Sequence, residues 1–152
     1  MVSPTTTRSA DKQSERSGFT IERTAKRMKQ VCQQMLKAAD SEITVDQWLI
    51  LQELDQLDGQ GQNEIARKVF KDAPTVTRII DLLCKKGLTE RANDPDDRRK
   101  FNIHLTPAGR RKIAEVHPVI LQYRQIAHRG LSERDLELLR SLLDRIFENL
   151  QD

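Results

Sequence analysis

Aromatic residues and long hydrophobic runs are scarce in this chain of 152 residues. Only 4% of its residues are aromatic, whereas 37% are hydrophobic, mainly leucine, isoleucine and alanine, and 32% are charged. This composition favours helices packed on one another over a β-sandwich, so we predict a mostly helical fold. No apolar run approaches the ~18 residues of a membrane span, and residues 1–18 contain no hydrophobic segment of a secretion signal. We therefore expect a cytoplasmic protein with no membrane partner.

Cysteine and histidine are also few. Cys32 and Cys84 are far apart and have no C-x-x-C spacing, so neither a disulfide framework nor a zinc site is indicated. Of the 3 histidines, His117 and His128 stand about 16 Å apart on one predicted helix and cannot share a metal ion. The sequence contains no nucleophile-elbow, zinc-protease or phosphate-loop pattern. We predict no catalytic residue, no metal and no cofactor, and hence a protein that is not an enzyme.

Positive charge is concentrated in one part of the chain. The net charge is only +3, but residues 63–112 contain 13 Lys and Arg against 7 Asp and Glu. That segment therefore carries +6 and the rest of the chain −3. Such segregation is typical of a nucleic-acid-binding face, whereas a solvated surface intersperses its signs. The charge pattern indicates that this segment binds phosphates.

Residues 72–87, DAPTVTRIIDLLCKKG, have the features of a helix that enters a DNA groove. Asp72 stands as the N-cap, Pro74 in the first turn and Gly87 just beyond the end. The apolar residues gather on one face at three- and four-residue spacing: Val76, Ile79, Ile80, Leu82 and Leu83. Threonine hydroxyls and an arginine fork on the other face suit phosphates and base edges. The predicted DNA contacts on this helix are Pro74, Thr75, Thr77, Arg78 and Lys85.

Two short strands joined by a charged turn follow this helix. They are predicted over residues 88–92 and 101–105, and the second should direct Phe101, Ile103 and Leu105 inward. The turn between them, residues 93–100, ends in three adjacent cations: Arg98, Arg99 and Lys100. A minor groove has a negative potential that attracts inserted arginine. We therefore predict that these three cations bind double-stranded DNA.

The segments before residue 72 complete a helix-turn-helix. Thr44 and Gln47 form a capping box that starts a helix at about Val45, with Ile43 and Trp48 as a hydrophobic staple. A short helix is predicted over residues 61–70, and residues 71–73 form the tight turn into the DNA-facing helix.

Apolar residues also recur at alternating spacings of three and four near both ends of the chain. The first seam, on a helix over residues 19–39, consists of Ile21, Ala25, Met28, Cys32, Met35 and Ala39. The last helix starts at Ser132, capped with Asp135, and its seam consists of Leu136, Leu139, Leu143, Ile146 and Leu150. These seams offer more apolar surface than a small module needs, so we predict a homodimer. Residues 1–17, rich in polar residues, are predicted to form a disordered tail.

The chain resembles the MarR (multiple antibiotic resistance regulator) family of winged-helix transcription factors. The resemblance is carried by TVTRIIDLLCKKGL, by the wing DPDDRR and by the LTPAG that closes it. Asp97 and Arg99 match the family's Asp-x-Arg pair, with Arg99 as the minor-groove residue, while Cys84 stands where the family has a charged or polar residue. The resemblance implies a winged helix-turn-helix with a β-hairpin wing over residues 18–152. Its DNA-binding lobe would span about 44–106, and its dimerisation helices about 19–40 and 107–151.

The resemblance also implies a homodimeric repressor on a pseudo-palindromic operator, relieved by a small aromatic or lipophilic effector. Met28, Trp48 and Tyr123 offer apolar walls and a hydroxyl for such a ligand, although each can equally pack in the core. Cys32 is open to two interpretations, a small buried hydrophobe or a redox switch. One alternative function also stays open: a winged-helix module that binds proteins, with its cations as a solvated face.

Overall fold

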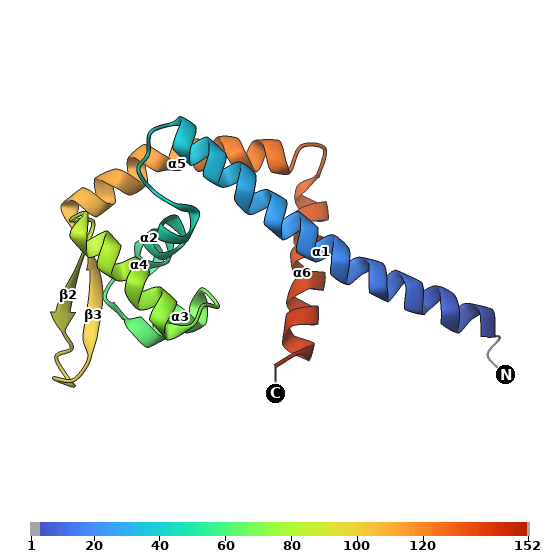
Figure 1. Cartoon of the computed structure of the whole chain (residues 1–152), viewed down its shortest axis with the longest axis horizontal. Helices are drawn as coiled ribbons and strands as arrows, with labels where there is room; N and C mark the ends of the chain where they lie inside the picture. Colours follow the sequence, from blue (N-terminus) through green and yellow to red (C-terminus); the bar gives the residue numbers. More distant parts are fainter. Residues whose placement is uncertain (1–3, 152) are drawn as a thin grey trace.

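The computed structural model describes residues 4–151, with side chains from residue 11 onward, and shows a mostly helical chain (Figure 1). The elements run in the order α1 (Pro4–Ala38), α2 (Val45–Gln56), β1 (Gln60–Gly61), α3 (Gln62–Lys68), α4 (Ala73–Lys85), β2 (Thr89–Asn93), β3 (Phe101–Leu105), α5 (Pro107–Ala127) and α6 (Glu133–Asn149). The elements from α2 to β3 form a lobe, and α1, α5 and α6 extend away from it (Figure 1). The predicted winged helix-turn-helix is confirmed.

The helix starts agree with the caps that the sequence predicts. Thr44 and Gln47 form the capping box of α2, and Ser132 and Asp135 form that of α6. At the start of α5, the Thr106 hydroxyl accepts a hydrogen bond from the backbone N–H of Gly109. These signals are local, because each cap satisfies N–H groups of the helix that it starts.

One hydrophobic core joins the lobe to α1 and α5. Its largest fully buried side chains come from both parts of the chain: Leu36, Ile50, Leu51, Leu54, Ile65, Val76, Ile80, Leu83, Ile103 and Val116. Cys32 is buried as the seam predicts, but Ile21 and Met28 of the same seam are exposed. The α1 residue at the centre of the core is instead Leu36, one helical turn beyond Cys32. Shared burial therefore ties the lobe to the C-terminal half of α1 and to α5.

The sheet contains a strand that the sequence did not reveal. Its order is β1-β3-β2, with Gln60 opposite Ile103 and Thr89 opposite Leu105. Two residues are too short to display an alternation of polar and apolar side chains. Gln60 is nevertheless buried, because its amide donates hydrogen bonds to the carbonyl oxygens of Leu57 and Glu53, at 2.6 and 3.2 Å.

The start of α5 lies directly on the chain that links α4 to β2. Thr106 donates hydrogen bonds from its hydroxyl to the Gly87 oxygen at 2.6 Å and from its backbone N–H to the Leu88 oxygen at 3.1 Å. One turn later, a Cβ atom on Gly109 would overlap that same Leu88 oxygen. Only glycine permits this approach. The wing root and the start of α5 are thus held together backbone to backbone.

Residues 4–17, for which the composition predicts a disordered tail, are part of helix α1 in the structure; residues 1–3 lie outside the described residues. Every side chain of α1 from Asp11 to Gln30 is exposed. From Asp11 onward, the polar composition of this segment agrees with the exposure of its side chains. It did not exclude a solvated helix that extends from the packed end of α1, because elongation of an existing helix needs no new nucleus.

Two predicted core positions are also wrong. Leu82 is 46% exposed, because it precedes Leu83 by one residue and so lies about 100° round the helix from it. Phe101 is 49% exposed, although Ile103 and Leu105 of the same strand are buried. Phe101 lies next to the wing tip, beyond the part of β3 that packs on the lobe. Alternation predicts which face a side chain is on, but not whether anything covers that face.

Candidate nucleic-acid interface

The first turn of α4 is held rigidly and presents a polar face. The Asp72 carboxylate accepts a hydrogen bond from the backbone N–H of Thr75 at 2.8 Å, which holds the pKa of Asp72 below its usual value. Pro74 and Arg78, one turn apart, are exposed, and Thr75 is half-buried beside them. Val76, Ile79, Ile80 and Leu83 are buried on the opposite side. The structure therefore brings Pro74, Thr75 and Arg78 together on one accessible face.

Thr77 and Lys85, the other two predicted contacts on α4, are placed differently. The Thr77 hydroxyl donates to the Ala73 oxygen at 3.0 Å and accepts from the Gln62 amide at 2.6 Å, so it links α4 to α3. Lys85 is exposed, but it lies about 10 Å further along the helix axis than Arg78. Neither belongs to the group at the start of the helix.

The wing tip is a compact turn stabilised by two aspartates. The Asp94 carboxylate accepts hydrogen bonds from the backbone N–H groups of Asp96 and Asp97, at 2.8 and 3.2 Å. The bond from Asp96 is the main reason why the pKa of Asp94 lies below its usual value. Asp97 in turn accepts from the backbone N–H of Arg99 at 3.0 Å. The aspartates of the DPDD segment thus shape the turn that carries the cations.

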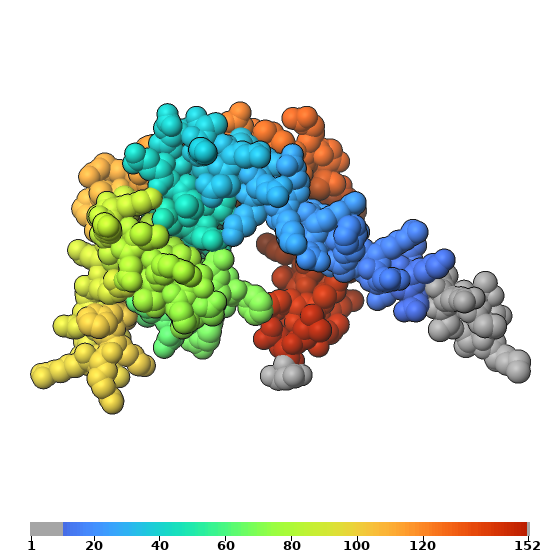
Figure 2. All heavy atoms as spheres, in the orientation of Figure 1, coloured from blue at the N-terminus to red at the C-terminus, as the bar shows by residue number. Residues whose placement is uncertain are grey.

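The cations of the tip project into solvent. The side chain of Arg99 is 93% exposed, with its Nε 3.5 Å from the Asp97 carboxylate, and Arg98 and Lys100 are exposed as well. Among the described residues, no carboxylate lies within 4.0 Å of the side-chain nitrogens of Arg98, Lys100 or Arg78. The tip forms the protruding yellow end of the molecule in Figure 2. The lobe thus offers two sets of available cations, one on α4 and one on the wing.

Arg91 supports the wing in a way that the sequence did not indicate. From β2 its guanidinium donates to Asp81 of α4 at 2.5 Å and to Gln62 of α3 at 3.3 Å. Since Gln62 also bonds Thr77, a chain of hydrogen bonds connects the wing, α4 and α3. The side chains that meet here lie on three elements, so no local pattern could reveal it. Cys84 lies beside this network, with its Sγ 3.3 Å from the Thr89 hydroxyl.

The three predicted ligand-binding residues line one cavity of about 360 Å³ between α1, α2 and α5. Trp48 is 6% exposed and belongs mainly to the core, so Met28 and Tyr123 form the more open walls. Three cations lie at this cavity: Lys29, Lys71 and Arg124. Lys29 and Lys71 bind the Asp46 carboxylate at 2.9 and 3.1 Å. Partial burial raises the pKa of Asp46, but the hydrogen bonds from the two lysines outweigh the effect of burial, so the pKa lies below its usual value.

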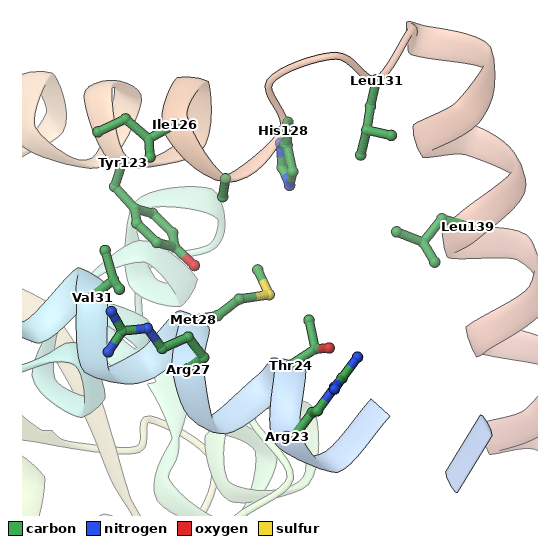
Figure 3. A pocket seen from close by; sticks show the side chains of 11 residues that line it. Arg23, Thr24, Arg27, Met28, Val31, Tyr123, Ile126, His128, Leu131 and Leu139 are labelled. Atoms are coloured by element: carbon green, nitrogen blue, oxygen red, sulfur yellow. The ribbon is translucent and has the colours of Figure 1, made fainter. Parts of the chain in front are cut away.

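A second cavity of about 600 Å³ adjoins the first, between α1, the end of α5 and α6. Figure 3 shows Met28 and the Tyr123 hydroxyl directed into it, with Arg23 and Arg27 along α1 and Leu139 on α6 opposite. Met28 and Tyr123 line both cavities. Burial raises the pKa of the Tyr123 phenol and of the neighbouring Cys32 thiol. At neutral pH both groups are therefore uncharged, and Cys32 is a poor nucleophile.

The described part of the chain contains no group of three or more His, Cys, Asp or Glu side chains placed to hold a metal ion. None of its helices combines the length and the hydropathy needed to cross a membrane.

A family model described as MarR family matches residues 43–101 of the chain. A crystal structure of the Staphylococcus aureus MepR–DNA complex has 30% sequence identity and a TM-score of 0.76; the match covers 88% of this chain and 97% of that one. A probable transcriptional regulator from Pseudomonas aeruginosa has 29% identity and a TM-score of 0.73, with 85% and 95% covered. BpsR of Bordetella bronchiseptica, whose DNA binding is described as regulated by 6-hydroxynicotinic acid, has 27% identity and a TM-score of 0.77, with 86% and 98% covered.

Proposed function

Because the chain belongs to the MarR family of winged-helix transcriptional regulators, we propose that it acts in the cytoplasm as a homodimeric repressor of a pseudo-palindromic operator. One observation carries the proposal: a recognition helix with exposed Pro74 and Arg78 stands in the same lobe as a wing tip with three exposed cations. Arg78 would read a base edge in the major groove, and Arg99 would enter the minor groove. Lys85 would contact the phosphate backbone, and Thr77 would hold α4 against α3.

The apolar face of α6 supports the dimer. Among the described side chains of α6, none is buried within the single chain. Its large exposed hydrophobics are Leu138, Leu139, Leu142, Leu143, Ile146 and Phe147. An exposed apolar face of this extent is characteristic of an interface between proteins. A two-fold axis through these helices would present the two recognition helices to successive major grooves, about 34 Å apart.

The two adjoining cavities support regulation by a small molecule. Their apolar walls, the Tyr123 hydroxyl and the nearby cations fit an aromatic acid or a hydrophobic phenol, with Arg27 or Arg124 facing a carboxylate. The cavities lie between α5 and the helices that pack on it, so a bound ligand would favour one angle of the lobe over another. A ligand that prefers a different angle must weaken DNA binding by its differential affinity, typically about 1–3 kcal/mol, and DNA must weaken ligand binding equally.

DNA binding can be tested with duplexes tiled across the region beside the coding sequence, by fluorescence anisotropy. We expect one duplex to bind about 10³-fold or more tightly than random DNA. Affinity for random DNA should fall steeply with salt, because bound cations release counterions from the phosphates. If binding shows neither a preferred duplex nor a salt dependence, the alternative of a protein-binding winged helix is favoured instead.

Effector coupling is tested on the complex with the preferred duplex. Salicylate-like acids and hydrophobic phenols are titrated at fixed salt and pH, while anisotropy reports DNA binding and emission reports Trp48, the sole tryptophan. Compounds that change Trp48 emission should also release DNA. If they leave DNA affinity unchanged, these cavities do not couple to the interface for this ligand class.

A further inference from the structure

Phe70, in the turn between α3 and α4, has an unusual backbone conformation for its side chain. Its φ is +52°, in the left-handed region, which is costly for a bulky residue. Lys71 donates from its backbone N–H to the Ala66 oxygen at 3.1 Å, so Phe70 occupies the C′ position of a Schellman motif. Glycine is the usual residue there, since it adopts this conformation without strain.

Helix α4, which follows this turn, ends in the same Schellman motif but has glycine at the C′ position. At the end of α4, Gly87 has a φ of +74° and Leu88 donates to the Leu83 oxygen at 3.0 Å. The chain therefore builds one geometry twice, once with glycine and once with phenylalanine. Because the Phe70 side chain is also 76% exposed, burial in the lobe does not explain its presence.

The Phe70 ring instead contacts α6. Its centroid lies 5.3 Å from that of Phe147, and the two rings are inclined at 79°, an edge-to-face pair. This geometry is favourable for aromatic rings. Phe147 lies near the C-terminal end of α6, eight residues beyond Leu139 on the proposed dimerisation face. On the face shown in Figure 2, the green lobe and the red helix are otherwise separated by open space.

Only a few residues of the chain separate Phe70 from the DNA-facing surface of α4. Phe70 precedes the N-cap of α4, Asp72, by two residues, and Pro74 and Arg78 follow on the first turns of the helix. A shift of α6 that carries Phe147 with it would therefore act at the start of the recognition helix. The only covalent route from α6 to the lobe runs through the whole of α5.

We propose that Phe70 and Phe147 are positioning residues, an aromatic latch that fixes the angle between the DNA-binding lobe and α6. In the dimer, this angle sets the separation of the two recognition helices and hence the half-site spacing that the protein accepts. The inference rests on the proposed dimeric operator binding. The latch touches no base; it determines where the reading residues stand.

Phe70→Gly tests the latch, because it removes the ring and also relieves the backbone strain. We expect a thermal midpoint equal to or above that of the wild type. Affinity for the best operator should fall by about three- to tenfold, the range for loss of one aromatic pair. Affinity for operators with the centre lengthened or shortened by one or two base pairs should change little. The difference in affinity between half-site spacings should therefore become smaller. The slope of affinity against salt should not change, since no phosphate contact is lost.

Phe70→Tyr is the matched control, since a tyrosine ring keeps the edge-to-face contact and should keep the wild-type spacing profile. Phe147→Leu should flatten the profile as Phe70→Gly does, and the double variant should show no additional effect. An equal loss of affinity at every half-site spacing, or a spacing profile unchanged from the wild type, would refute the proposed latch.

A measurement without DNA separates the latch from the proposed function. Spin labels at Gln56→Cys on α2 and Ser141→Cys on α6, with both native cysteines replaced, report the lobe-to-α6 distance within one chain diluted in unlabelled protein. The distance distribution should broaden in Phe70→Gly and stay narrow in Phe70→Tyr. An unchanged width in Phe70→Gly refutes the latch. If wild-type protein prefers no palindrome over random DNA, the proposed function fails, and the distance distribution alone decides on the latch.

Discussion

Replacement of Arg91 by alanine should loosen the wing from the recognition helix without removing a DNA contact. The guanidinium joins Asp81 at 2.5 Å and Gln62 at 3.3 Å, and the side chains of Arg91 and Asp81 are 27% and 58% exposed. For an ion pair this accessible to water, a contribution of about 0.2–1 kcal/mol is typical. The hydrogen bond to Gln62 adds about 0.5–1 kcal/mol. We therefore expect Arg91→Ala to lower the free energy of unfolding by about 1–2 kcal/mol.

Urea denaturation of Arg91→Ala, Asp81→Ala and the double variant measures the coupling between the two side chains, which should be about 0.5–1 kcal/mol. Glu90→Ala is the matched control, because Glu90 precedes Arg91 on β2, faces the other side and is exposed. Operator affinity should also fall in Arg91→Ala, but with an unchanged salt slope, since Asp81 already neutralises the guanidinium. A coupling near zero would refute the network, and a salt slope reduced by about one would mean that Arg91 binds phosphate directly.

Three further predictions concern the interface, the dimer and the wing. Arg99→Ala should weaken binding to all duplexes, whereas Arg78→Ala should cost about 1–3 kcal/mol and relax the preference at one base position, measured by competition with single-base variants of the operator; equal losses on operator and random DNA for Arg78→Ala would assign it to phosphate alone. Leu139→Glu with Leu143→Glu should give monomers by light scattering and weak specific binding, and a double variant that stays dimeric would exclude α6 as the interface. The pKa of Asp94 is lowered in the folded chain, so its hydrogen bonds contribute fully above the ordinary pKa and are lost as the pH falls through the lowered one. The protection of the Asp96 amide against exchange, relative to its intrinsic rate, should therefore fall only in acid below about pH 4, and equal protection at pH 2 and pH 6 would contradict this role.

The sequence predicted best what neighbouring residues decide among themselves. Asp72 caps α4 because its carboxylate reaches an N–H three residues away, whatever surrounds the helix. The charged turn between the strands follows in the same way from aspartates that bind adjacent backbone N–H groups. The interactions that stabilise these features lie within one turn of the chain, so the residue types in that turn are sufficient to predict them.

What the sequence could not predict depends on elements brought together by folding. Leu82 and Phe101 have the correct spacing for a core, yet about half of each side chain stays exposed. The sequence does not distinguish Arg91 and Gln62 from other polar residues, because their hydrogen bonds form only when β2, α3 and α4 pack together. Phe70 looked like the end of a helix, because neither its left-handed conformation nor its distant partner leaves a periodic signal.

Gly109 shows how such a contact would mislead a genetic map. If the protein acts as the proposed repressor, random alleles selected for loss of repression should include substitutions of Gly109, because any side chain there pushes the first turn of α5 away from the Leu88 backbone. These alleles would have the phenotype of lost DNA contacts, with normal protein levels if the chain tolerates the shift. Their position on the sequence, however, would assign them to the long helix beyond the wing. The cause would be the loss of a backbone contact that forms only because Gly109 has no Cβ atom.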